Sequence, residues 1–111
     1  MQSLTIRNTI AEPLHRKNLD ALRLRMDSID EQVIELLTAR MNLAREIGRY
    51  KGEHGMTILQ MERWKEVFDT RGGWAASAGL GPEFIESFLE QVHKESIRVQ
   101  TEEMDQKKYP L

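Results

Sequence analysis

The chain contains no cysteine, which excludes disulfide bonds and thiolate metal sites. Its three histidines, His15, His54 and His93, are isolated and lack a ligand spacing such as i, i+4, so no metal and no cofactor are expected. The N-terminus has no apolar signal segment, and no stretch approaches the length of a membrane span. These absences make a protein of the cytoplasm, with no membrane partner, the default expectation.

Neither sign of charge is in large excess, because the formal net charge of the 111 residues is only −2. The overall charge therefore gives no reason to expect nucleic acid or an anionic membrane as a partner. Aromatic residues make up only 6% of the chain, and strand-like alternation of apolar and polar residues is absent. Glutamate, leucine and arginine are the most frequent residues, and all three favour helices. The predicted fold class is all-α.

Three helices of unequal length are predicted. Residues 1–17 contain Pro13 and no sustained periodicity, so they are interpreted as an N-terminal arm or linker. The helical domain spans residues 18–106, and residues 107–111 form a C-terminal tail. The predicted helices run from an N-cap at Asn18 to about Gly52, over about 60–71 before two glycines, and from Pro82 to about residue 106. A turn over 52–58 and a loop over 74–81 connect them.

The first predicted helix is too long for a compact monomer. Its roughly 34 residues span about 50 Å at 1.5 Å per residue. A compact chain of this size has a radius of gyration of roughly 13 Å. We therefore expect the long helix to pair with its copy in an intertwined helical homodimer.

Two cations lie within the apolar stripe of this helix. Arg40 occupies the stripe position between Leu36 and Leu43, and Lys51 lies one turn after Ile47. Eleven residues separate the two cations, which is about three turns, so they point the same way with Ala44 and Ile47 between them. A buried charge is costly unless it is paired. Two like charges on one buried face suggest that an anion binds there.

The third predicted helix repeats this anomaly with neutral groups, because Ser96 lies in its apolar stripe and Gln100 follows one turn later. Each residue has a simpler explanation when taken alone. Arg40 could pair with Glu35 or Glu62, Lys51 could extend to solvent at a helix end, and Arg63 could be a surface charge. Together they place three cations and two hydrogen-bonding groups where the helices meet. This set suits a small dianion, held and activated by positioning and electrostatics.

Arg23 cannot join the same pocket within one chain. It precedes Arg40 by 17 residues, so it lies about 25 Å away along a straight helix and points roughly 100° away from it. In an antiparallel dimer of long helices it could reach the pocket of the partner chain. The alternative is a surface arginine near Asp27.

The ordered set of residues resembles the all-helical class of chorismate mutases. The resemblance covers about residues 19–104 without obvious gaps. Its motifs are Leu22 and Arg23, Ile29 and Asp30, Leu36 and Leu37, Arg40, Leu43 and Ala44, Ile47 and Gly48, Lys51, the segment 58–63, Ser96 and Ile97, and Gln100. The resemblance implies an intertwined homodimer that converts chorismate to prephenate in aromatic amino-acid biosynthesis, without a metal or a covalent intermediate.

The resemblance also implies a role for each residue. Arg40 would hold a substrate carboxylate, and Lys51 and Gln100 would donate to the ether oxygen of the breaking bond. Arg23 would come from the partner chain. The remaining pocket residues would be Ser96 beside a carboxylate, Arg63 from the second helix, Gln60 toward the ring hydroxyl, and Ala44 and Ile47 as the apolar wall.

The second helix departs from the pattern of that family, since many members are acidic at the positions of Gln60 and Trp64. The run over residues 59–64 looks more like mutase domains fused to 3-deoxy-7-phosphoheptulonate synthase, the enzyme that opens the shikimate pathway. Two alternatives to a mutase stay open: an isochorismate pyruvate lyase with a similar set of cations, and a non-catalytic module for dimerisation or regulation of a fused enzyme.

Overall fold

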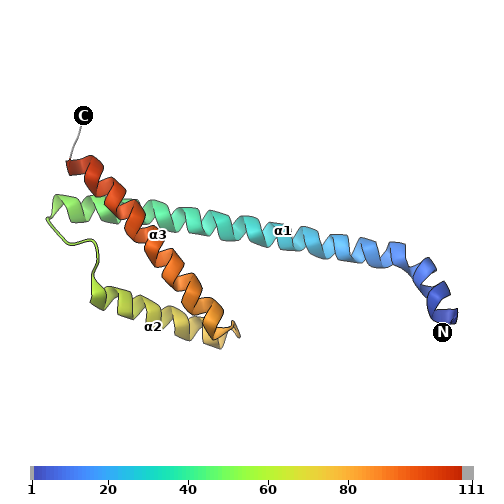
Figure 1. The fold of residues 1–111 in the computed structure, drawn as a ribbon. Coiled ribbons are helices and arrows are strands. Elements are labelled where there is room, and N and C mark those ends of the chain that lie inside the picture. The colour runs from blue at the N-terminus through green and yellow to red at the C-terminus, as the bar shows by residue number, and fades with distance from the viewer. Residues whose placement is uncertain (1, 109–111) are drawn as a thin grey trace. The chain divides into compact units, whose positions relative to one another are not determined.

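Three α-helices and no strand make up the described part of the chain, which confirms the all-α prediction (Figure 1). The computed structural model describes the backbone of residues 2–108 and the side chains of residues 15–105. The helices are α1 (Gln2–Glu53), α2 (Met61–Ser77) and α3 (Pro82–Lys108). The chain forms two compact units, one up to Thr38 and one from Ala39 onward.

Helix α1 begins at Gln2, so the prediction that it begins at Asn18 was wrong. A proline inside a helix removes one backbone hydrogen bond, crowds the preceding turn and disfavours helical angles at the residue before it, but a helix can continue through it with a kink. Pro13 is therefore compatible with the helical backbone of residues 2–17. The assignment of these residues to an arm outside the domain stays a prediction. Of the predicted tail, residues 109–111 lie outside the described part.

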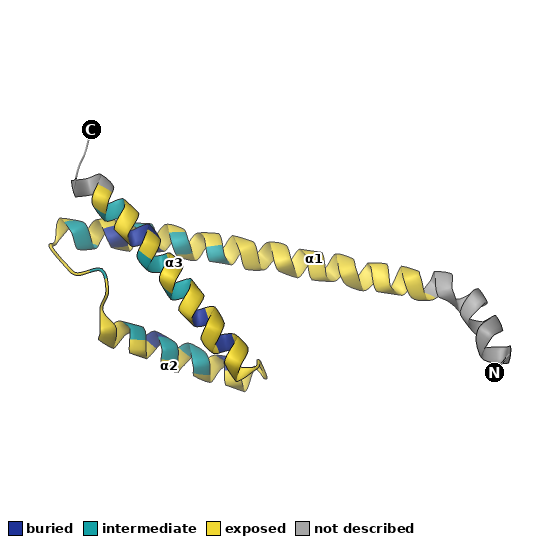
Figure 2. Ribbon diagram, in the orientation of Figure 1, coloured by how far each residue is buried: buried dark blue, intermediate teal, exposed yellow. Residues whose placement is uncertain are grey.

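Within the N-terminal unit, the apolar stripe of α1 has no cover (Figure 2). All side chains described from His15 to Thr38 are exposed except Leu37, which is half-buried. The stripe residues expose between 44% and 70% of their surface; they are Leu22, Met26, Ile29, Val33 and Leu36. None of the helices described here is long and apolar enough to cross a membrane. An uncovered stripe of this length marks an interaction surface.

Helix α1 ends at Glu53 through a glycine in the left-handed region. Gly55 has φ = 63°, and the Met56 amide donates to the Lys51 carbonyl at 2.8 Å. This six-to-one hydrogen bond satisfies one of the last carbonyl groups of the helix. The predicted turn over residues 52–58 is therefore confirmed, and it fixes the backbone directly beside Lys51.

Helix α2 continues six residues beyond the predicted end at Arg71, because Gly72 and Gly73 lie inside it. Each glycine in a helix costs about 1 kcal/mol relative to alanine. The next turn offsets that cost by burying Ala75 against Ile85 and Leu89 of α3. The helix ends at Ser77, two residues before Gly79, which has φ = 81°.

Helix α3 begins at Pro82 as predicted, and it holds the C-terminal unit together. Its apolar residues pack on α2, with Trp64 and Phe68 at the edge of the cluster. The last turns of α1 approach α3 closely at Gly48. A Cβ atom at residue 48 would lie 2.7 Å from the Gln100 Cα atom. Only glycine allows the two backbones to come this near.

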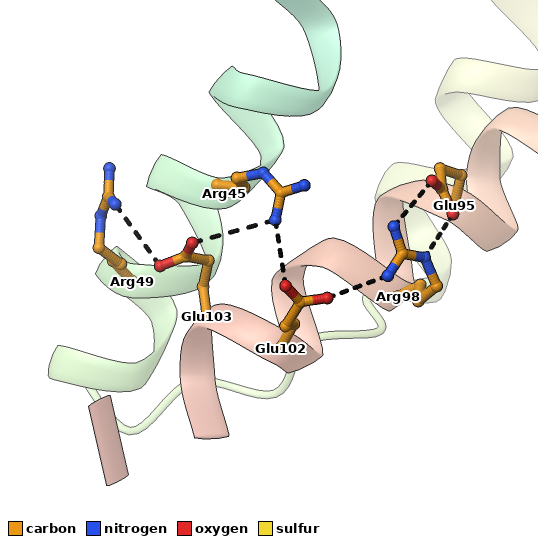
Figure 3. A network of polar contacts seen from close by, with 6 residues as sticks. All are labelled: Arg45, Arg49, Glu95, Arg98, Glu102 and Glu103. Atoms are coloured by element: carbon orange, nitrogen blue, oxygen red, sulfur yellow. Dashed lines mark hydrogen bonds and ion pairs between the residues drawn. The ribbon is translucent and has the colours of Figure 1, made fainter. Parts of the chain in front are cut away.

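A set of ion pairs on the surface links the same two helical segments (Figure 3). Arg45 approaches Glu102 at 3.7 Å and Glu103 at 4.0 Å, and Arg49 reaches Glu103 at 3.5 Å. Arg98 continues the set by bonding Glu102 at 2.9 Å. Exposed pairs of this kind contribute little stability individually, about 0–1 kcal/mol. Because four charged side chains meet across α1 and α3, they favour one register of the two helices.

Candidate active site

A cavity of about 520 Å³ lies between α2, α3 and the part of α1 that belongs to the C-terminal unit. This volume is within the range of pockets that hold small molecules. Aliphatic side chains form part of its wall, including Ala44, Ile47 and Val67. Its polar lining consists of Arg40, Lys51, Gln60, Arg63, Arg71, Trp64, His93, Ser96 and Gln100.

The structure brings together all but one of the residues that the sequence singled out. The lining includes Arg40, Ala44, Ile47, Lys51, Gln60, Arg63, Ser96 and Gln100. Arg23 belongs to the N-terminal unit, where it lies 3.8 Å from Asp20. The catalytic and binding roles of these residues stay predictions.

Lys51 turns its ammonium group toward α3. Its Nζ donates to the Ile58 carbonyl at 2.6 Å and to Gln100 Oε1 at 2.8 Å. Both partners are neutral, so the charge of Lys51 has no carboxylate beside it among residues 15–105. Partial burial lowers the pKa of Lys51 from its usual value. An ammonium group has three donors, and one remains for a ligand.

Gln100 is buried, with 6% of its surface exposed, and its amide continues the chain of hydrogen bonds. While Oε1 accepts from Lys51, Nε2 donates to Ser96 Oγ at 3.0 Å. The ammonium group can only donate, so it requires the amide oxygen to face Lys51 and the amide nitrogen to face away. The second N–H of Nε2 is then available to a ligand. Three groups picked out by sequence position thus form one connected array.

Arg40 makes neither of the ion pairs that the sequence left open. The Arg40 side chain is exposed. Within the described residues it forms no ion pair or hydrogen bond with Glu35, Glu62 or any other group. Partial desolvation, followed by repulsion from Arg71 and Arg63, lowers the pKa of Arg40. Its guanidinium therefore lies in a positive potential that an anion would relieve.

Two cations of α2 supply that potential. Arg63 donates to Glu66 at 2.5 Å, which is the surface pairing that its neighbours suggest. Arg71 bonds Thr70 Oγ1 at 2.9 Å and lies 4.6 Å from the centre of the Trp74 ring. Sequence reasoning missed Arg71 because it was placed at the end of the helix. The spacing of Arg63, Val67 and Arg71 at i, i+4 and i+8 was a signal, since these positions share one helical face.

An aromatic pair forms another part of the wall. Trp64 and His93 stack with ring centres 4.0 Å apart and planes inclined by 16°. Desolvation, and then the charge of Arg40, lowers the pKa of His93, which favours the neutral imidazole. From the sequence, His93 was weighed only as a possible metal ligand. Its position three residues before Ser96 and seven before Gln100 places it on the same helical face and was the overlooked signal.

The lining therefore combines four cations with neutral hydrogen-bonding groups, and no aspartate or glutamate of residues 15–105 belongs to it. Such a site binds a small anion through charge-assisted hydrogen bonds. It can also stabilise negative charge that develops on a bound atom, because its donors are already oriented. No group of three or more potential metal-ligating side chains occurs in the described part.

Comparison with known proteins agrees with this chemistry. The family model described as chorismate mutase type II matches residues 22–101. A T-protein from Enterobacter agglomerans is 36% identical over 78 residues, which cover 70% of this chain and 21% of that protein. Two proteins named 4-amino-4-deoxychorismate mutase are also similar. The one from Streptomyces pristinaespiralis is 30% identical over 84 residues (76% of this chain, 65% of that protein), and the one from Streptomyces venezuelae is 29% identical over 85 (77% and 82%). The chain thus spans about a fifth of the T-protein, and no solved structure matches significantly.

Proposed function

Because this chain belongs to the chorismate mutase type II family, we propose that it converts chorismate to prephenate in aromatic amino-acid biosynthesis. The observation that carries the proposal is the Lys51–Gln100 hydrogen bond of 2.8 Å at the wall of a cavity with four cations. This hydrogen bond holds Lys51 and Gln100 next to each other, and each keeps an N–H donor for a ligand. Chorismate is a small dicarboxylate, which matches the charge of the lining.

The reaction is an intramolecular Claisen rearrangement, in which the ether C–O bond breaks while a C–C bond forms. Partial negative charge grows on the ether oxygen as that bond stretches. The remaining donors of Lys51 and Gln100 would meet this charge more strongly in the transition state than in the bound substrate, which is the requirement for catalysis. Their contact with each other fixes both donors before the substrate arrives.

Arginines would hold the two carboxylates in the compact conformation that the rearrangement needs. Arg40 is suited to this task because no carboxylate of the described residues occupies it. Arg63 and the Ser96 hydroxyl would complete the polar contacts, while Ala44 and Ile47 form the apolar wall against the substrate ring. Gln60 is proposed to meet the ring hydroxyl. Holding reacting atoms in this geometry contributes several kcal/mol, up to about 7–11, to lowering the barrier.

The active assembly is proposed to be a homodimer in which Arg23 reaches the cavity of the partner chain. The exposed apolar stripe of the N-terminal unit supports this proposal, since it runs along the same helical stretch that carries Arg23. Fusion to, or association with, a 3-deoxy-7-phosphoheptulonate synthase domain is part of the proposal on the resemblance of residues 59–64. Sedimentation equilibrium of the purified chain tests the dimer directly.

Two parallel incubations test the proposed activity. Purified protein is mixed with chorismate and, separately, with isochorismate, and prephenate and salicylate are quantified. We expect prephenate from chorismate. Salicylate from isochorismate, with no prephenate from chorismate, would identify a lyase. Self-association without turnover of either compound would identify a non-catalytic module.

A further inference from the structure

The charges around the cavity are unbalanced. Arg40, Lys51, Arg63 and Arg71 line it, and no aspartate or glutamate in the described part of the chain does. Glu66, a carboxylate of α2 near this site, is outside the lining and already accepts a hydrogen bond from Arg63 at 2.5 Å. Within the C-terminal unit, a positively charged group on a ligand would find repulsion at the wall and no counter-ion.

This imbalance distinguishes two possible substrates. Two relatives are named as mutases of 4-amino-4-deoxychorismate, in which an amino group replaces the hydroxyl at position 4. Such an amine on a saturated carbon ordinarily carries a proton at neutral pH, like the side chain of lysine. The two compounds therefore share the carboxylates and the breaking ether bond, but they differ by one positive charge.

We propose that this chain selects chorismate over 4-amino-4-deoxychorismate, because no carboxylate of the described residues lines its cavity to pair with an ammonium group. The inference rests on the proposed mutase function and identifies the substrate of that site. An ammonium group taken from water into a site without a counter-ion loses hydration that nothing replaces. Desolvation, and then the charge of Arg40, lowers the pKa of His93 on α3, so the field of Arg40 extends across the cavity.

A hydroxyl group, in contrast, finds neutral partners on the same walls. Gln60 uses its Nε2 to donate to the Thr57 carbonyl at 3.3 Å, which leaves its Oε1 able to accept. The neutral imidazole of His93 offers a second acceptor and is held in place by the Trp64 ring. Either acceptor satisfies a hydroxyl without a change of charge.

The test compares kcat/KM for the two compounds with the native chain and with Gln60→Glu. We expect kcat/KM of the native chain to be at least about tenfold higher for chorismate than for the amine. Gain or loss of one ion pair commonly changes such a constant by about that factor. Gln60→Glu adds a carboxylate at the wall and is expected to narrow the preference by about tenfold, mainly through a lower KM for the amine. Trp64→Glu repeats the test from a second position.

Met61→Glu is the matched control, because it adds the same charge one residue away and outside the cavity lining. It is expected to leave the preference unchanged. Equal or better turnover of the amine by the native chain would overturn the inference while leaving a mutase function intact. A preference that neither Gln60→Glu nor Trp64→Glu alters would also overturn it. Turnover of neither compound would remove the proposed function, and the inference with it.

Discussion

Substitution of Gly48 by alanine tests whether the contact between α1 and α3 sets the geometry of the site. An added Cβ atom would lie 2.7 Å from Gln100 Cα and 2.8 Å from the Gln100 carbonyl oxygen. Carbon atoms pack at about 3.5–4.0 Å, so α3 must move away by roughly 1 Å. All of the atoms first met belong to the backbone, and a rotamer change therefore cannot relieve the overlap.

Two consequences follow for Gly48→Ala. The overlap costs about 1–3 kcal/mol, of which the better helix propensity of alanine returns about 1 kcal/mol. A shift of 1 Å at Gln100 would also lengthen its 2.8 Å contact with Lys51 beyond hydrogen-bonding distance. Because misplacement by 1 Å can reduce turnover about a hundredfold, we expect a large loss of kcat with a smaller loss of stability.

The assay combines the rate of chorismate loss with thermal unfolding followed by circular dichroism. Gly73→Ala is the control, because Gly73 is also inside a helix but its added Cβ would meet nothing within 4 Å. That variant should be more stable by about 1 kcal/mol and keep native turnover. The reasoning would be refuted if Gly48→Ala also gained stability and retained its activity.

Three further predictions concern individual side chains. Lys51→Ala and Gln100→Ala should each lower kcat by about a hundredfold or more, measured by chorismate loss, since removing one such donor costs about 3 kcal/mol; native rates in both would contradict their roles. Arg23→Ala and Lys51→Ala should each be inactive, yet an equal mixture with exchanged chains should regain about a quarter of native activity, because half of the dimers then contain one intact site of two; no recovery after verified exchange would exclude a shared site. The pKa of His93 is lowered on folding, so the unfolded chain binds its proton first as pH falls. The contribution of neutral His93 to the free energy of unfolding is therefore complete above about pH 6.5 and is lost as the pH falls below that value. Urea unfolding midpoints measured from pH 7.5 to 5 should decline less in His93→Gln than in the native chain.

Sequence patterns predicted the parts of the fold that depend on local chemistry. Pro82 at the start of α3 and Gly55 after α1 act through backbone geometry that neighbouring residues determine, and both lie where expected. The pair Gly72 and Gly73 gave a wrong helix end for the opposite reason. Whether α2 continues through them depends on the burial of Ala75 against Ile85 and Leu89, and that contact comes from a helix later in the chain.

The candidate site shows the same division. Lys51, Ser96 and Gln100 were found because each is a polar residue on an otherwise apolar helical face. Arg71 was missed because it was placed at the end of α2, and His93 was missed because it was weighed only as a metal ligand. Their place in the cavity follows from how α2 and α3 pack together. A hydrophobic pattern identifies a buried face, but it does not identify which side chains converge across two helices.

Gln100 joins packing and chemistry at a single residue. Its backbone lies against Gly48, and its side chain links Lys51 to Ser96. A movement of α3 along or away from α1 would therefore change both the core contact and the position of two donors. The ion pairs of Arg45 and Arg49 with Glu102 and Glu103 restrain that movement from the surface, within one turn of Gln100 on α3. A glycine that weakens α1 as an isolated helix is thus the residue that lets α3 approach closely enough for the hydrogen-bonded array to form.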